Sequence, residues 1–72
     1  MREVIVTKEP VELYKILKFE GMVGSGGEAK AAVAEGRVQV NGKVETQKSK
    51  KIVSGDVITF GTEEVVIKFK LD

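Results

Sequence analysis

The chain has 72 residues, of which 42% are hydrophobic and 32% charged, the composition of a folded protein with one small core. It contains no Cys and no His, which excludes disulfides, thiolate or imidazole metal sites, and catalysis by a Cys nucleophile or a His base. No apolar run approaches the ~20 residues of a membrane span, and the N-terminus lacks a signal-peptide core, so we expect a cytoplasmic protein.

The first elements expected are a short strand and a helix. Residues 3–6 have the composition of a strand. Pro10 stands where a helix would begin, since a proline in the first turn removes no hydrogen bond. Residues 11–19 follow with an apolar stripe of helical spacing, made of Leu13, Tyr14, Ile16 and Leu17. Gly21 is expected to cap the end of this helix.

A second helix is predicted over residues 26–35. Ser25, with Glu28 three residues later, fits the capping box at a helix N-terminus. The expected inward stripe consists of Ala29, Ala32 and Val33. Small alanine side chains allow the two helices to approach closely, and Gly36 ends the second one.

The rest of the chain is predicted to be β structure. Residues 38–40 alternate, and Asn41-Gly42 is the typical sequence of a type I′ hairpin turn. Residues 47–51 form a polar loop, and Ser54-Gly55-Asp56 forms a second turn. Strands are expected at 57–60 and 65–69, the last with Val65, Ile67, Phe69 and Leu71 on one face.

The order of these elements, β-α-α-β-β-β-β, predicts one α+β domain over residues 1–72. In it, a helical hairpin packs on a small antiparallel sheet. Charge is unevenly spread along this domain: residues 37–51 carry five basic side chains and one acid, whereas the remainder carries seven basic and ten acidic ones. A single basic segment on an otherwise slightly acidic chain, whose total net charge is +1, indicates an anionic partner.

Residues 13–60 resemble the RNA-binding domain named for ribosomal small-subunit protein four, here the S-four domain or alpha-L motif. The resemblance rests on the order of several fragments, above all "EGRVQVNG" at Glu35 to Gly42 and "SGDVI" at Ser54 to Ile58. Short stand-alone bacterial proteins of this type resemble the chain nearly end to end, including "SGGEAK" at Ser25 to Lys30. The chain departs at Gly26, where many S-four domains carry an Arg that helps to hold RNA.

This resemblance implies RNA binding through the helical hairpin and the loop after the second helix. The expected partner is structured RNA, either rRNA or tRNA, with the ribosome as a further candidate. Enzymes that carry an S-four domain keep their catalysis on other domains. The chain is therefore expected to be a monomeric binding protein, with no catalysis, no cofactor and no metal.

Three groups of residues make up the candidate RNA-binding set. The glycine segment at the second helix offers free N–H groups to a phosphate, although it also fits a simple cap and turn. Lys30 and Arg37, about two helical turns apart, are expected along one edge of that helix. The lysines after it have no acidic residue within 47–51 to neutralise them and could each bind a phosphate. A loop that only increases solubility would have the same sequence pattern. The full set is Ser25, Gly26, Gly27, Lys30, Arg37, Lys43, Lys48, Lys50 and Lys51.

Other residues fit structural roles better. Tyr14, Phe60 and Phe69 lie in apolar stripes and are expected in the core, whereas Phe19 ends a helix and is left undecided between core and surface. Lys15 and Lys18 have Glu12 and Glu20 nearby, which favours a solvated helix face; Asp56 fits a turn. Without an aromatic-rich strand, phosphate placement and duplex shape are favoured over base reading.

Two other functions remain open from the sequence. In the first, exposed strand edges recruit a protein partner. In the second, the chain is an accessory that acts in trans with an RNA-modifying or ribosome-rescue enzyme. A ubiquitin-like sulfur carrier is disfavoured, because such carriers end in Gly-Gly and this chain ends in Lys70-Leu71-Asp72.

Overall fold

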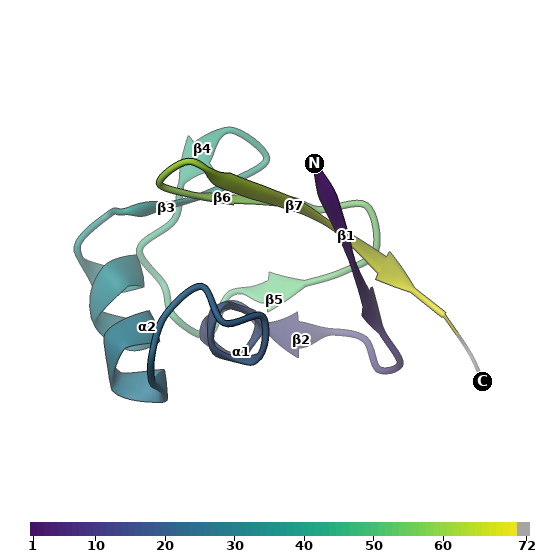
Figure 1. Ribbon diagram of the computed structural model, residues 1–72, viewed down its shortest axis with the longest axis horizontal. Helices are drawn as coiled ribbons and strands as arrows, with labels where there is room; N and C mark the ends of the chain where they lie inside the picture. The colour runs from purple at the N-terminus through teal and green to yellow at the C-terminus, as the bar shows by residue number, and fades with distance from the viewer. Residues whose placement is uncertain (71–72) are drawn as a thin grey trace.

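The structure is a computed structural model that describes residues 1–70, with a helical hairpin below a curved sheet (Figure 1). The elements are β1 (Arg2–Val6), β2 (Val11–Glu12), α1 (Leu13–Phe19), α2 (Gly26–Ala34), β3 (Val38–Val40), β4 (Lys43–Val44), β5 (Lys51–Ile52), β6 (Val57–Phe60) and β7 (Glu63–Phe69). The predicted α+β class with a helical hairpin is confirmed.

The core lies between the helical hairpin and the sheet, with the apolar stripes expected from the sequence. Leu13, Ile16 and Leu17 of α1 are buried, as are the three residues predicted for α2, Ala29, Ala32 and Val33. From the strands, the core includes Val38, Val40, Ile52, Ile58, Val65 and Ile67. Burial of this continuous apolar surface is what holds so small a domain together.

The start of α2 and the C-terminal ends of both helices follow the predicted signals. The Ser25 hydroxyl accepts a hydrogen bond from the Glu28 N–H at 3.1 Å, so Ser25 is the N-cap of α2. The return bond of the capping box is shifted: the Glu28 carboxylate accepts from the N–H of Gly24, at 3.1 Å, and not from that of Ser25. Gly21 and Gly36 follow the two helices with φ of 68° and 75°, the left-handed conformation of a helix C-cap.

The predicted type I′ turn is confirmed and has a tertiary role. Asn41 and Gly42 have φ of 53° and 84°. The Asn41 side chain accepts from the N–H of Val57 at 2.9 Å and donates to the Asp56 carboxylate at 3.0 Å. The turn between β3 and β4 is thereby fastened to the start of β6.

The prediction of an antiparallel sheet was wrong for one strand. The sheet order is β1-β7-β6-β3-β4, and β1 pairs with β7 in parallel, whereas the other neighbours are antiparallel. Both helices and the inner strands lie between β1 and β7 in the chain, which gives the long connection that a parallel pair requires. Alternation along a strand carries no information on its direction, so the sequence pattern did not reveal this.

The expected start of the first helix and the expected loop at 47–51 were also incorrect in detail. Pro10 precedes β2 and does not open a helix, and α1 begins only at Leu13. The reason is that Val11–Glu12 pairs with Lys51–Ile52 in a short antiparallel ribbon. Leu71, expected on the inner face of the last strand, lies outside the described residues. Neither helix within residues 1–70 is long and apolar enough to cross a membrane.

We predict that Asn41→Ala lowers the free energy of unfolding by about 2 kcal/mol, because it removes two side-chain hydrogen bonds and strains a positive φ. Asn41→Gly restores the backbone freedom but not the bonds, so its stability should lie between those of Asn41→Ala and the unchanged protein. Urea unfolding followed by circular dichroism measures both. Equal stability of the two variants would show that backbone conformation contributes nothing here.

Candidate nucleic-acid interface

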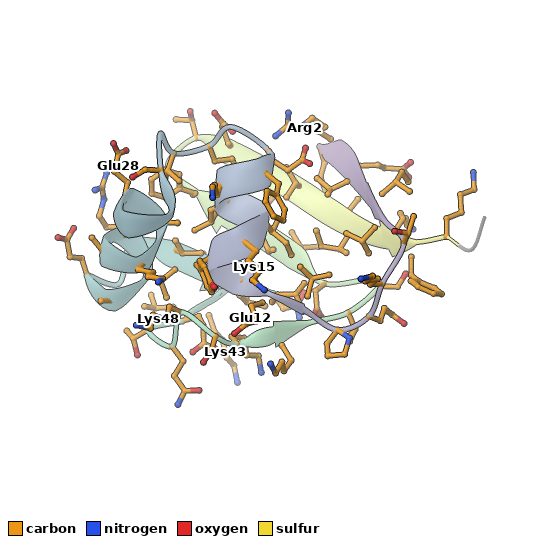
Figure 2. The ribbon with its side chains drawn as sticks, turned by 90° about the horizontal axis from the view of Figure 1, so that it is seen from below. Arg2, Glu12, Lys15, Glu28, Lys43 and Lys48 are labelled. Carbon is orange, nitrogen blue, oxygen red and sulfur yellow. The ribbon has the colours of Figure 1, made fainter. Side chains whose placement is uncertain are left out.

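The segment that carries the lysines is fixed to the start of α1 by its backbone. The Leu13 N–H donates to the carbonyl of Lys50 at 2.9 Å, and the Tyr14 N–H donates to the carbonyl of Lys48 at 3.1 Å. The first N–H groups of a helix have no acceptor within the helix, so this segment supplies the acceptors that α1 needs. Lys48 and Lys15 accordingly both lie at the N-terminal end of α1 (Figure 2).

Three of the predicted lysines surround one open hollow of about 470 Å³. Lys43 comes from β4, and Lys50 and Lys51 come from the segment that leads into β5. All three are exposed. Glu45 and Asp56 also line the hollow, so its three basic side chains lie beside two acidic ones.

Both carboxylates of the hollow are engaged by backbone N–H groups. Glu45 accepts from the N–H of Gln47 at 3.0 Å, and Asp56 accepts from the N–H of Val53 at 3.0 Å. The Asp56 carboxylate thus acts in a turn, as predicted. Within residues 1–70, the ion pairs of the structure do not include any of the lysines of residues 43–51. The lysines therefore present their charge to solvent, where a phosphate can bind.

The glycine segment forms the N-terminus of α2, and its anion-binding capacity is partly used. The Glu28 carboxylate folds back onto the N–H of Gly24 and supplies negative charge there. Gly26 and Gly27 belong to the same first turn, in which N–H groups have no acceptor inside the helix. A Cβ built on Gly26 would lie 3.8 Å from the Lys18 side chain. A cation from α1 is thus close to the position where many S-four domains have Arg.

Lys30 and Arg37 do not form the single edge expected from their spacing. The Lys30 ammonium lies 5.0 Å from the centre of the Tyr14 ring on α1. The Arg37 guanidinium lies 5.3 Å from the centre of the Phe60 ring on β6, and 3.7 Å from the Glu35 carboxylate. The helix ends at Ala34 and the chain reverses at Gly36, so the helical spacing does not extend to Arg37.

Lys15 forms an ion pair with Glu12 at the start of α1. Its ammonium lies 3.1 Å from the Glu12 carboxylate, as expected for a solvated helix face. The hydrogen bond and the charge of Glu12, with a further contribution from the charge of Tyr14, raise the pKa of Lys15 above its ordinary value. Lys15 thus stays charged throughout the physiological range.

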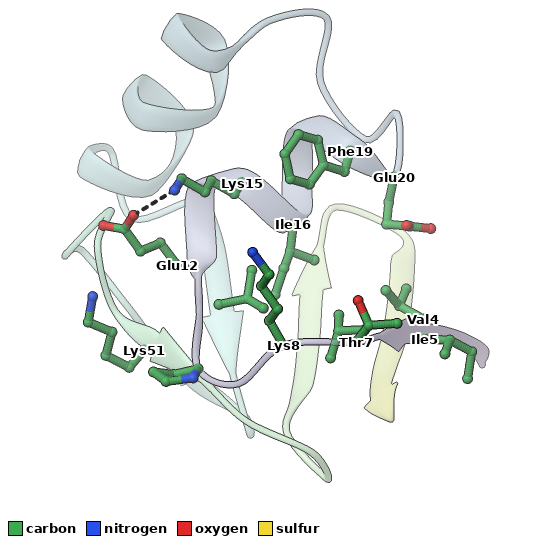
Figure 3. Close-up of a pocket in the computed structure, with 13 residues that line it drawn as sticks. Val4, Ile5, Thr7, Lys8, Glu12, Lys15, Ile16, Phe19, Glu20 and Lys51 are labelled. Carbon is green, nitrogen blue, oxygen red and sulfur yellow. Dashed lines mark ion pairs between the residues drawn. The ribbon is translucent and has the colours of Figure 1, made fainter. Parts of the chain in front are cut away.

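A second hollow, which we call the α1 groove, was not found by sequence reasoning. It has a volume of about 580 Å³ and lies between α1 and the segment from β1 to β2 (Figure 3). Its lining includes Lys8, Lys15, Lys51 and Phe19. These residues come from three separate segments, so spacing along the chain could not bring them together. The sequence signals near this site were the adjacent lysine loop, Lys15 on a solvated helix face and Phe19, which was left undecided between core and surface.

The aromatic side chains follow the sequence expectation only in part. Tyr14 and Phe60 are partly buried and pack against the core, whereas Phe69 is half-buried on β7 and does not belong to the core cluster. Phe19, left undecided between core and surface, is 69% exposed. In the part of the chain that the structure describes, no three Asp or Glu side chains converge to form a metal site.

The comparisons with known proteins agree on one family. Residues 4–68 match the S4 domain family. YbcJ of Escherichia coli K12 is 49% identical over 57 residues, covering 79% of this chain and 81% of YbcJ; YbcJ of Shigella flexneri matches equally. The solution structure of E. coli YbcJ, described as revealing an alpha-L motif involved in RNA binding, superposes with a TM-score of 0.72. That match has 43% identity and covers 94% of this chain and 87% of YbcJ.

We predict that Glu12→Gln lowers the pKa of Lys15 toward its ordinary value, because it removes the charge and weakens the hydrogen bond that raise it. NMR titration of the Lys15 side chain measures this. By linkage, the ion pair stabilises the fold below the ordinary lysine pKa, and the stabilisation disappears as pH rises through the raised one. Glu20→Gln is the control, since Glu20 pairs with Arg2 and should leave Lys15 unchanged.

Proposed function

The chain belongs to the S4 domain family, and we therefore propose that it binds structured RNA, either rRNA or tRNA. The binding surface, which we call the lysine face, consists of Lys43, Lys48, Lys50 and Lys51. We propose the first turn of α2, with Ser25, Gly26 and Gly27, as a second phosphate contact, together with Lys30 and Arg37. The alpha-L motif described for the YbcJ structure supports this assignment.

The observation that carries the proposal is the fixed backbone of the lysine face. Its carbonyl groups bind the first turn of α1, and the nearby carboxylates are held by N–H groups of the turns. The lysines therefore project from a positioned backbone with their charge uncompensated within residues 1–70. A preformed array of cations loses little conformational freedom when it meets a phosphate backbone.

The proposed mechanism is electrostatic anchoring without chemistry. Each lysine that meets a phosphate releases condensed counterions, which favours binding and makes it dependent on salt. Phosphate and sugar contacts fix the position of the protein but do not read sequence, so we expect recognition of RNA shape. We propose that residues 1–72 act as one monomeric, non-catalytic unit in the cytoplasm, and that the bound rRNA or tRNA can be part of a ribosome.

We predict that Lys50→Glu combined with Lys51→Glu weakens binding to rRNA and tRNA roughly ten-fold at about 50 mM salt, because two phosphate contacts become repulsive. For the unchanged protein, the plot of log affinity against log salt should have a slope equivalent to about three to five phosphate contacts. Filter binding or fluorescence anisotropy over a salt series measures both quantities, with duplex DNA as the weaker competitor.

The matched control is Lys68→Glu combined with Lys70→Glu, which reverses the same charge on and after β7, away from the lysine face. Circular dichroism should be intact for both double variants. An equal loss in both would reduce the effect to net charge and contradict the proposed surface. If the unchanged protein binds neither rRNA nor tRNA at about 50 mM salt, RNA binding is wrong, and a protein partner on the open edge of β1 becomes the better hypothesis.

A further inference from the structure

The α1 groove contains an exposed aromatic ring that the lysine face does not use. Phe19 is 69% exposed, whereas an aromatic side chain of a small domain is normally needed in the core. Phe19 and Lys15 are four residues apart on α1 and therefore share one helix face. Val11 and Ile16 line the same groove and provide an apolar wall below the ring.

Basic side chains line the groove that contains this ring. Lys8 extends toward the side of α1 that carries Lys15 and Phe19, and Lys51 lines the groove farther from Phe19 (Figure 3). Two carboxylates also line it, but each has a partner. Glu12 is bound by Lys15 at 3.1 Å, and Glu20 lies 3.9 Å from the guanidinium of Arg2.

Lys8 and Lys51 therefore carry the excess charge of the groove. Among residues 1–70, neither lies within ion-pair distance of a carboxylate. The nearby Glu9 carboxylate is directed elsewhere, since it accepts from the N–H of Ser54 at 2.6 Å. A flat apolar surface with free cations beside it complements a ligand that has both a planar ring and an anionic group.

The groove is continuous with the lysine face. Lys51 lines both the α1 groove and the hollow formed with Lys43 and Lys50. An RNA backbone that follows the lysine face thus reaches the groove at Lys51, beside Glu12, whose carboxylate is paired with Lys15. The volume of about 580 Å³ is within the range of pockets that hold small organic groups such as a single base.

We propose that the α1 groove holds one unpaired nucleotide of the bound RNA, its base stacked on Phe19 and its phosphate contacted by Lys8 and Lys51. This inference rests on the proposed RNA-binding function and narrows its ligand to a duplex flanked by an unpaired segment, such as a stem-loop. Unstacked bases commonly bind aromatic side chains beside cationic ones, and this contact is available only outside a duplex.

The test compares a stem-loop RNA with the same stem as a blunt duplex. Phe19→Ala should weaken stem-loop binding about ten-fold and change duplex binding less than two-fold, because stacking on one base is lost. Phe19→Leu, which keeps apolar bulk without an aromatic face, should lose most of the same affinity. The matched control is Val44→Ala, since Val44 is 59% exposed but lies on β4, outside the groove.

The lysine part of the site has its own readout. Lys8→Ala should weaken stem-loop binding a few-fold and reduce the salt slope by about one phosphate contact. Lys68→Ala, on the outer side of β7, should change neither quantity. In NMR titrations of the unchanged protein, the resonances of Lys8 and Phe19 should shift with the stem-loop and not with the duplex.

Failure of this inference differs from failure of the proposed function. If the duplex and the stem-loop bind equally and Phe19→Ala behaves like Val44→Ala, the nucleotide site is wrong while RNA binding stands. If neither RNA binds, both proposals are overturned. A third outcome is that neither RNA shifts the Phe19 resonances, whereas a nuclease-treated cell extract does. The groove is then a protein-binding site, and the nucleotide proposal is overturned.

Discussion

The rest of the molecule depends on the backbone pairing between residues 11–14 and 48–52. Because α1 has only seven residues, the first N–H groups, which have no acceptor inside the helix, are a large fraction of all its backbone donors. The carbonyls of Lys48 and Lys50 accept hydrogen bonds from two of these N–H groups. The β2–β5 ribbon continues the same pairing. One set of bonds therefore stabilises the first helix, buries Ile52 in the core and positions the basic segment.

The proposed RNA-binding surface depends on where the acidic side chains lie and what they bind. Net charge is close to zero, so a basic surface requires that the acidic side chains lie elsewhere or pair with cations. Turn N–H groups hold Glu45, Asp56 and Glu9, and cations hold Glu12 and Glu20. Lys51 lines both the hollow of the lysine face and the α1 groove, and so connects the two sets of basic side chains.

Local features were predictable because their signals lie within a few residues. The Ser25 cap, the closing Gly36 and the Asn41-Gly42 turn each follow from short-range backbone requirements, and all three are present. The β2–β5 ribbon and the parallel pairing of β1 were missed. Two-residue strands carry no periodicity, and strand direction is set by long-range burial, which alternation along the chain does not encode.

For the candidate site, the basic segment, the family resemblance and the candidate residues of the lysine face could be inferred from the sequence. Tertiary packing sets how these residues are grouped. It directed Lys30 and Arg37 to different aromatic rings, because the helix ends before Arg37. It also gathered Lys8, Phe19 and Lys51 around one groove. The physical reason is that caps and turns are fixed by adjacent residues, whereas a groove between a helix and two distant segments exists only after the core has packed.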